Sequence, residues 1–117
     1  MFMKMYSNAT DAISDLHMQG FTSDFHLSGN DLLWVQEGFL IRAGEFAIVR
    51  HYKIEEAKNR MNKLAVFGVI ALYHNIKGIL LNHFRDYSET TPPILVKKLN
   101  ELNFYGKTKP ENSYLKL

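Results

Sequence analysis

The chain has 117 residues, of which 46% are hydrophobic, and its 14 basic and 12 acidic side chains give a formal net charge of +2. This length fits a single domain that buries roughly two thirds of its unfolded surface, and it leaves no room for a second core. The chain contains no cysteine. Disulfides, thiolate nucleophiles, iron–sulfur clusters and cysteine-bound zinc are therefore excluded, and a reducing cytoplasm is expected.

The N-terminal residues and the apolar runs of the sequence do not predict secretion or membrane insertion. The first ten residues, MFMKMYSNAT, lack the apolar region and cleavage site of a signal peptide. The longest apolar run, Leu64 to Tyr73, is ten residues, whereas a helix needs ~20 to cross a bilayer. The net charge is divided unevenly, because residues 1–50 carry −3 and residues 51–117 carry +5.

The first predicted element is a helix over residues 8–19. Ala9, Ala12, Ile13 and Leu16 recur at helical spacing, Ser7 or Asn8 can cap the first turn, and Gly20 ends it. An extended segment over residues 22–27 follows.

After residue 27 the spacing of hydrophobic residues changes from the helical period to the alternation typical of strands. Turn residues separate predicted strands at 32–36, 39–42 and 46–54. In the last of these, strict alternation puts Arg50 on the same face as Phe46, Ile48, Tyr52 and Ile54, and His51 on the other face with Val49 and Lys53. Residues 55–62 are polar and predict a loop.

The segment 64–73 is apolar on both faces and predicts a central strand. A hairpin turn is predicted at residues 75–78, followed by a strand at 79–84. The expected register of this hairpin places Ala71 opposite Asn82. A last helix begins with Pro92 at its first position and runs to 102. Residues 103–117 show no period and predict a flexible or docking tail.

These elements predict an α+β protein: one helix, a five-stranded antiparallel meander and one helix, in a single domain over residues 1–102. Both helices are expected on one side of the sheet.

Five short stretches of the chain carry a resemblance to known proteins. They are Gly20-Phe21-Thr22-x-Asp24-Phe25, Glu45-Phe46-x-Ile48, Ile76-Lys77-Gly78-Ile79-Leu80-Leu81, Tyr87-Ser88 and Lys97/Lys98-Leu99. Together they resemble a group of small bacterial proteins of undetermined function that often carry the name phosphoribosylpyrophosphate synthetase. The resemblance covers most of residues 8–102 and implies a fold. It does not imply that reaction, because no paired aspartates followed by a Thr/Gly-rich turn occur to bind Mg²⁺ and phosphate.

The chain departs from that group at one loop and at its end. Where the group has an Arg-Phe-Glu-Gly stretch and an Asp-rich loop, this chain reads Tyr52-Lys53-Ile54-Glu55-Glu56 and then AKNRMN. It also continues fifteen residues past the last predicted helix. A role that depends on the acidic loop is therefore not expected here.

Polar residues at the end of two predicted strands form one candidate ligand site. Arg50, His51, Arg85 and Tyr87 could line a shallow pocket for a small anionic ligand or nucleotide, since arginine binds two oxygens and tyrosine can stack. The alternative is a strand end in solvent, with Arg85 and Asp86 forming a local pair.

Other chemistry finds no support in the sequence. The five histidines show no metal-ligand spacing, and no nucleophile elbow or phosphate-binding glycine loop occurs. We therefore predict no catalytic residue, no metal and no cofactor, and hence no enzyme.

The leading hypothesis is an interaction or structural module that forms a homodimer. With both helices on one side, the central hairpin would leave an apolar face for a second subunit. Alternatively, residues 39–54 curl the sheet into a half-barrel and bury this face. The candidate interface residues are Phe67, Val69, Tyr73, Leu80 and Phe84.

A further alternative concerns the basic C-terminal stretch. Lys97, Lys98, Lys107, Lys109 and Lys116 alternate with aromatic residues, a composition that can bind single-stranded nucleic acid. This C-terminal stretch contains no arginine, and the net charge of the whole chain is only +2. Both observations favour instead a solubilising tail, or one that docks on a partner protein.

Overall fold

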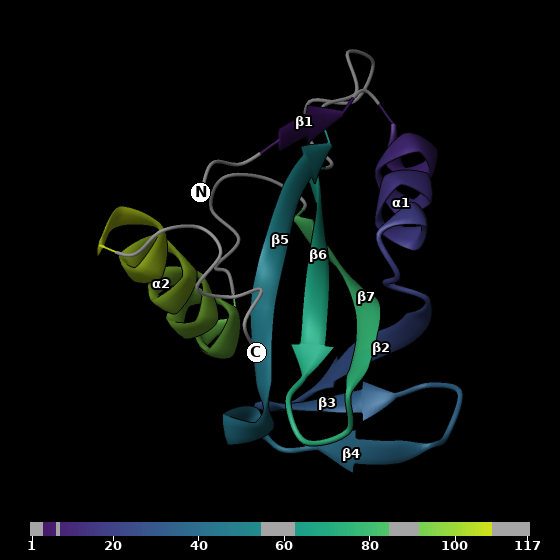
Figure 1. The fold of residues 1–117 in the computed structure, drawn as a ribbon, viewed down its shortest axis with the longest axis vertical. Coiled ribbons are helices and arrows are strands. Elements are labelled where there is room, and N and C mark those ends of the chain that lie inside the picture. The colour runs from purple at the N-terminus through teal and green to yellow at the C-terminus, as the bar shows by residue number, and fades with distance from the viewer. Residues whose placement is uncertain (1–3, 7, 55–62, 85–91, 109–117) are drawn as a thin grey trace.

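The computed structural model describes residues 4–6, 8–54, 63–84 and 92–108 (Figure 1). Within this part of the chain, seven strands and two α-helices form one α+β unit, as the sequence predicts in class. The elements in chain order are β1 (Lys4–Tyr6), α1 (Ala9–Met18), β2 (Ser23–Ser28), β3 (Asp31–Trp34), β4 (Phe39–Ile41), the 3-10 turn η1 (Ala43–Glu45), β5 (Phe46–Ile54), β6 (Lys63–Ala71), β7 (Ile76–Phe84) and α2 (Pro93–Thr108).

The sheet is mixed, so the predicted five-stranded antiparallel meander is wrong. The strand order is β1-β5-β6-β7-β2-β3-β4. The pairs β5–β6, β6–β7, β2–β3 and β3–β4 are antiparallel, whereas β1–β5 and β2–β7 are parallel. The chain therefore does not pass from β4 to a neighbouring strand. It turns through η1 and crosses to β5, while β3 and β4 lie across the lower end of the sheet (Figure 1).

Helix α1 forms where the sequence predicts it, because both of its ends carry local signals. The Asn8 side chain accepts a hydrogen bond from the Asp11 amide at 2.9 Å and caps the first turn. At the other end Gly20 has φ +94°, a conformation that other residues rarely adopt. The amides of Gly20 and Phe21 donate to the carbonyls of His17 and Leu16, which is a Schellman motif.

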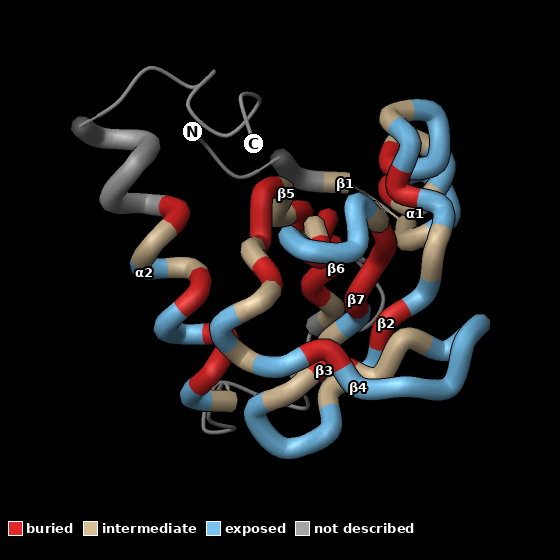
Figure 2. The backbone as a smooth tube through the Cα atoms, turned by 60° about the horizontal axis from the view of Figure 1, so that its bottom comes forward, coloured by how far each residue is buried: buried red, intermediate tan, exposed pale blue. Residues whose placement is uncertain are grey.

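The two helices cover opposite faces of the sheet, so the expectation that both lie on one side is wrong (Figure 1). Helix α1 packs Ala12 and Leu16 against Val49 and Val66. Helix α2 packs Ile94, Leu95 and Leu102 into the other cluster. That second cluster also contains Phe25 of β2, Leu32 of β3 and Ile41 of β4, because the sheet bends around it. In Figure 2 the central strands β5, β6 and β7 carry long buried stretches, as expected for strands covered on both faces.

A β-bulge in β5 overturns the predicted face assignment. Ile48 pairs with Val69, but Arg50 pairs with Gly68, so Val49 is an extra residue in the ladder. Val49 and Tyr52 consequently belong to the α1 cluster, whereas Phe46 and Ile48 belong to the α2 cluster. Strict alternation fails because a bulge places two successive side chains on the same side of a strand.

Two boundaries also differ from the predictions. The β6–β7 hairpin turns at residues 72–75, and Ala71 pairs with Ile76 rather than with Asn82. Helix α2 begins at Pro93, one residue later than predicted, and continues to Thr108. The helix therefore extends six residues beyond its predicted end at 102, and residues 109–117 of the predicted flexible or docking tail lie outside the described residues.

Candidate functional site

The structure places Arg50 and His51, two of the four residues predicted to bind a small anion, on opposite faces of the sheet. The Arg50 guanidinium lies on the α1 face, with Cζ 5.8 Å from the centre of the Phe21 ring. His51 lies on the opposite face and stacks on Phe67, at 5.0 Å between ring centres. Because adjacent strand residues outside the bulge point to opposite faces, Arg50 and His51 do not form one pocket. Arg85 and Tyr87 lie outside the described residues.

Arg50 instead belongs to a cluster at the carboxyl end of α1. Its Nε donates to the Gln19 side chain at 2.9 Å, and the Gln19 amide group donates to the Tyr52 hydroxyl at 3.0 Å. Lys77 Nζ donates to the Gln19 carbonyl at 2.7 Å and lies 4.3 Å from the centre of the Phe21 ring. The two cations therefore stabilise the negative end of the helix dipole and bind the face of a buried aromatic ring.

The residues predicted to form a dimer interface are mostly internal. Phe67, Val69 and Leu80 are 1%, 0% and 1% exposed, because α2 and the bent sheet cover them. The expected uncovered face therefore does not exist at these three positions. Tyr73, in the β6–β7 turn, is 76% exposed. The side chain of Phe84 lies outside the described residues.

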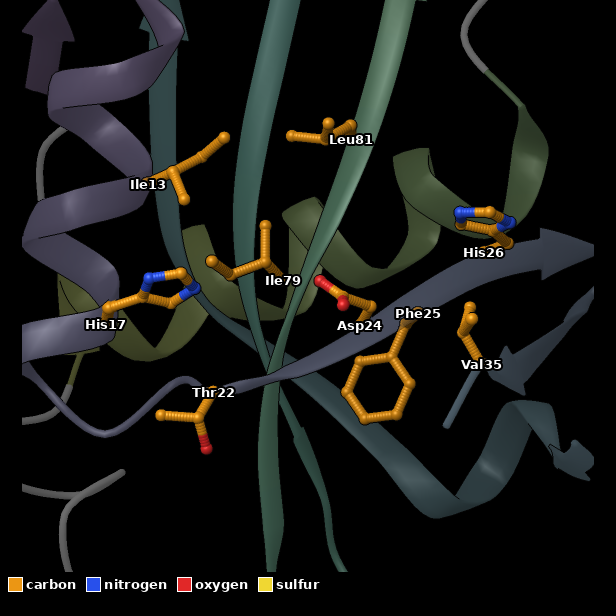
Figure 3. Close-up of a pocket in the computed structure, with 9 residues that line it drawn as sticks. All are labelled: Ile13, His17, Thr22, Asp24, Phe25, His26, Val35, Ile79 and Leu81. Carbon is orange, nitrogen blue, oxygen red and sulfur yellow. The ribbon is translucent and has the colours of Figure 1, made fainter. Parts of the chain in front are cut away.

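A groove lies beside α1, where the helix leaves the β7–β2 side of the sheet uncovered (Figure 3). Its volume of about 560 Å³ falls within the range of small-molecule sites. Ile13 and His17, one helical turn apart, form the wall from α1, and Ile79 and Leu81 of β7 form the floor. Figure 3 shows the Asp24 side chain between these residues and the far end of the groove at His26 and Val35.

The position of Asp24 follows from the parallel pairing of β2 with β7. Asp24 pairs with Ile79, and the Val35 amide donates to the Asp24 carbonyl at 2.9 Å, so these residues lie side by side across three strands. The Gln36 side chain forms two hydrogen bonds with Asp24. It donates to the carboxylate Oδ2 at 2.7 Å and accepts from the Asp24 amide at 2.9 Å. The second carboxylate oxygen, Oδ1, accepts no hydrogen bond from the described residues.

A second surface, which we call the aromatic end, lies where the β3–β4 and β6–β7 turns meet. It consists of the rings of Trp34, Phe39 and His74 together with the exposed Tyr73. Trp34 and Phe39 pack edge to face at 5.1 Å, and the Phe39 and His74 rings lie 5.3 Å apart. The Trp34 Nε1 group is buried and has no hydrogen-bond partner in the described structure.

Strand β4, at the outer edge of the sheet, borders the aromatic end and is apolar on both faces. Ile41 is fully buried opposite Leu32, whereas Leu40 is 50% exposed opposite Leu33, and Phe39 is 39% exposed. Natural edge strands are usually short or carry charges, proline or a bulge that prevent pairing with another chain. Of these devices, the three residues of β4 have only their short length.

Among the described residues, no three histidine or acidic side chains come together in a way that could hold a metal ion. Likewise, no helix in the described ranges is long and apolar enough to cross a membrane. The fold and these surfaces thus define an α+β protein with an open mixed sheet, one groove beside α1 and an exposed apolar edge. Comparison with models of known families, with curated proteins and with solved structures gave no match for this chain.

Asp24, Gln36 and His17 are not among the site residues predicted from the sequence. Alternation over 22–27 does place Asp24 and His26 on one face, and Ile13 and His17 have the i, i+4 spacing of neighbours on a helix. The parallel pairing of β2 with β7 brings the β2 residues close to the α1 residues. No short sequence pattern predicts this pairing. The groove could therefore be found only after the strand order was known.

Proposed function

We propose that this protein is a non-enzymatic interaction module of the cytoplasm that forms a homodimer through strand β4. The observation that supports the dimer is that β4, a sheet edge, exposes Phe39 and Leu40 on its two faces beside the aromatic end. A strand that is apolar on both faces is typical of a sheet interior. A second copy of β4, running antiparallel about a two-fold axis, would turn this edge into an interior strand.

This proposal moves the interface away from the face suggested by the sequence. Of the residues first considered, Tyr73 alone borders the new surface. The cytoplasmic location is supported by the absence of cysteine from the sequence.

The test is light scattering after size exclusion, comparing the wild type with Leu40→Lys. The wild type is expected to have twice the chain mass of 13.6 kDa. Leu40→Lys is expected to be monomeric, because a charge on an edge strand opposes pairing. Val96→Lys is the matched control, because Val96 is similarly exposed, at 43%, but lies on α2. A wild type that is monomeric at high micromolar concentration, or a Leu40→Lys dimer, would contradict the proposal.

Of the alternatives, an anion site that uses Arg50, His51, Arg85 and Tyr87 gains no support, because Arg50 and His51 lie on opposite faces and Arg85 and Tyr87 lie outside the described residues. Binding of single-stranded nucleic acid through the basic tail remains a prediction, since residues 109–117 lie outside the described residues. Its test is the mobility of labelled single strands at low salt, where phosphate contacts are strongest.

A further inference from the structure

We infer that the groove beside α1 is a binding site for a small organic cation, namely a protonated amine on an apolar body. The site does not depend on the proposed dimer, because it is formed within one chain by α1, β2, β7 and the turn that follows β3. Two features of the groove specify this ligand class.

The first feature is a carboxylate that is fixed in place and has a free acceptor. Gln36 binds both the Oδ2 atom and the backbone amide of Asp24, so the side chain is oriented before any ligand arrives. Oδ1 accepts no hydrogen bond within the described part of the chain. An ammonium group is the natural partner, since a charge-assisted hydrogen bond is stronger than a neutral one. Arg50 and Lys77 bind Gln19, and neither is among the residues that line the groove.

The second feature is the apolar lining on both sides of Asp24. Ile13, Ile79 and Leu81 lie on the α1 side, and Val35 lies at the opposite end (Figure 3). Val35, in the turn after β3, and Leu81, in β7, are each 42% exposed, so both aliphatic side chains are in contact with solvent. An apolar ligand body would cover these side chains while its cationic group reached Asp24. A fully charged polar molecule such as a nucleotide would leave them in contact with phosphate and water.

The experiment is an NMR titration of the full chain with three indoles of nearly the same size. Tryptamine carries an ammonium group, tryptophol a neutral hydroxyl, and indole-3-acetate a carboxylate. We expect saturable amide shifts at Ile13, His17, Asp24 and Ile79 with tryptamine, weaker binding of tryptophol and no binding of indole-3-acetate. Equal affinities for tryptamine and tryptophol, or shifts confined to residues outside the groove, would overturn the inference.

Two variants separate the contributions of charge and lining. Asp24→Asn keeps an oxygen for Gln36 but removes the charge, and it should weaken tryptamine about fivefold, the size of one exposed ion pair, while leaving tryptophol unchanged. Leu81→Asn should weaken both ligands to a similar degree. Glu37→Gln is the matched control, because it removes one negative charge next to Gln36 in the sequence but outside the groove lining. An Asp24→Asn variant that folds, as judged by its amide spectrum, and binds tryptamine like the wild type would contradict the assignment of Asp24.

Discussion

Gly78 shows how one residue fixes the contact between two strands. The sequence suggests a glycine of the hairpin turn, but the residue lies within β7, paired with Ser23 of β2. A Cβ atom added at Gly78 would lie 2.6 Å from the Ser23 carbonyl oxygen and 2.6 Å from Cε2 of Phe25. Glycine is therefore required here for the close approach of the Phe25 ring and the β2 backbone.

We predict that Gly78→Ala lowers the free energy of unfolding by about 1–3 kcal/mol, because buried groups must move to admit the methyl group. Gly44→Ala is the control, since a Cβ atom at Gly44 has no neighbour within 4 Å and should change stability by less than about 0.5 kcal/mol. Urea unfolding of both variants measures the difference. Equal stabilities of the two variants would show that β2 does not pack against Gly78 in this way.

His51 gives the fold a dependence on pH. Burial against Phe67, and secondarily the charge of Lys53, lowers the pKa of His51 below its usual value. The unfolded chain therefore binds a proton at a higher pH than the folded chain does. The stability contributed by neutral His51 is complete above about pH 6.5 and is lost as the pH falls through the lower pKa of the folded state.

We predict that His51→Phe, which keeps a ring stacked on Phe67, reduces the loss of stability on the acid side of neutrality. The measurement is a series of urea midpoints from neutral to weakly acidic pH, compared with His26→Phe, which changes an exposed histidine. If the urea midpoint of His51→Phe falls with decreasing pH as steeply as that of the wild type, groups other than His51 cause the loss of stability.

At the scale of elements, the bulge in β5 decides which side chains enter each core. Val49 is the extra residue, and the segment after it turns Tyr52 and Ile54 toward α1. A regular strand would turn them toward α2 instead. The bulge therefore allows one strand to supply Phe46 and Ile48 to one core and Tyr52 and Ile54 to the other.

We predict that inserting one alanine after Val49 abolishes cooperative folding, because it shifts the following segment by one residue and turns Tyr52 and Ile54 away from α1. Deletion of Val49 is the matched variant. It removes only the extra residue, so Arg50 still pairs with Gly68, and the variant should remain folded with a stability reduced by about 1–3 kcal/mol through loss of a buried side chain. Amide dispersion in NMR and thermal unfolding followed by circular dichroism distinguish the two outcomes. A folded insertion variant of near wild-type stability would show that the register after the bulge does not matter in this way.

At the scale of the whole molecule, the sheet is the central layer and divides the protein into two cores. Each helix closes one core, and β4 is left as an apolar edge. If two copies join there, the apparent stability must rise with protein concentration, since association stabilises only the folded state. The thermal midpoint of the wild type should therefore increase with concentration, whereas that of Leu40→Lys should not.

The parts of this architecture that the sequence predicted are those with local causes. Asn8 and Gly20 mark the ends of α1, and alternation and flanking turns place a strand at 46–54 with the observed bounds. The parallel pairings have no local cause in the sequence. Asp24 pairs with Ile79, which is 55 residues away along the chain, through the tertiary fold alone. The predicted interface failed for the same reason: Phe67 and Leu80 look unprotected until α2 is placed on their face.

The pairing of β2 with β7 also sets an order of events during synthesis. Ser23 pairs with Gly78, 55 residues further along the chain, so β2 leaves the ribosome long before its partner exists. Throughout that interval the β2–β3–β4 unit has two unpaired edges and no helix α2 to cover Phe25, Leu32 and Ile41. Nascent chains of this protein are thus most open to misassociation before β7 emerges, and slow translation of residues 55–84 would prolong the exposure.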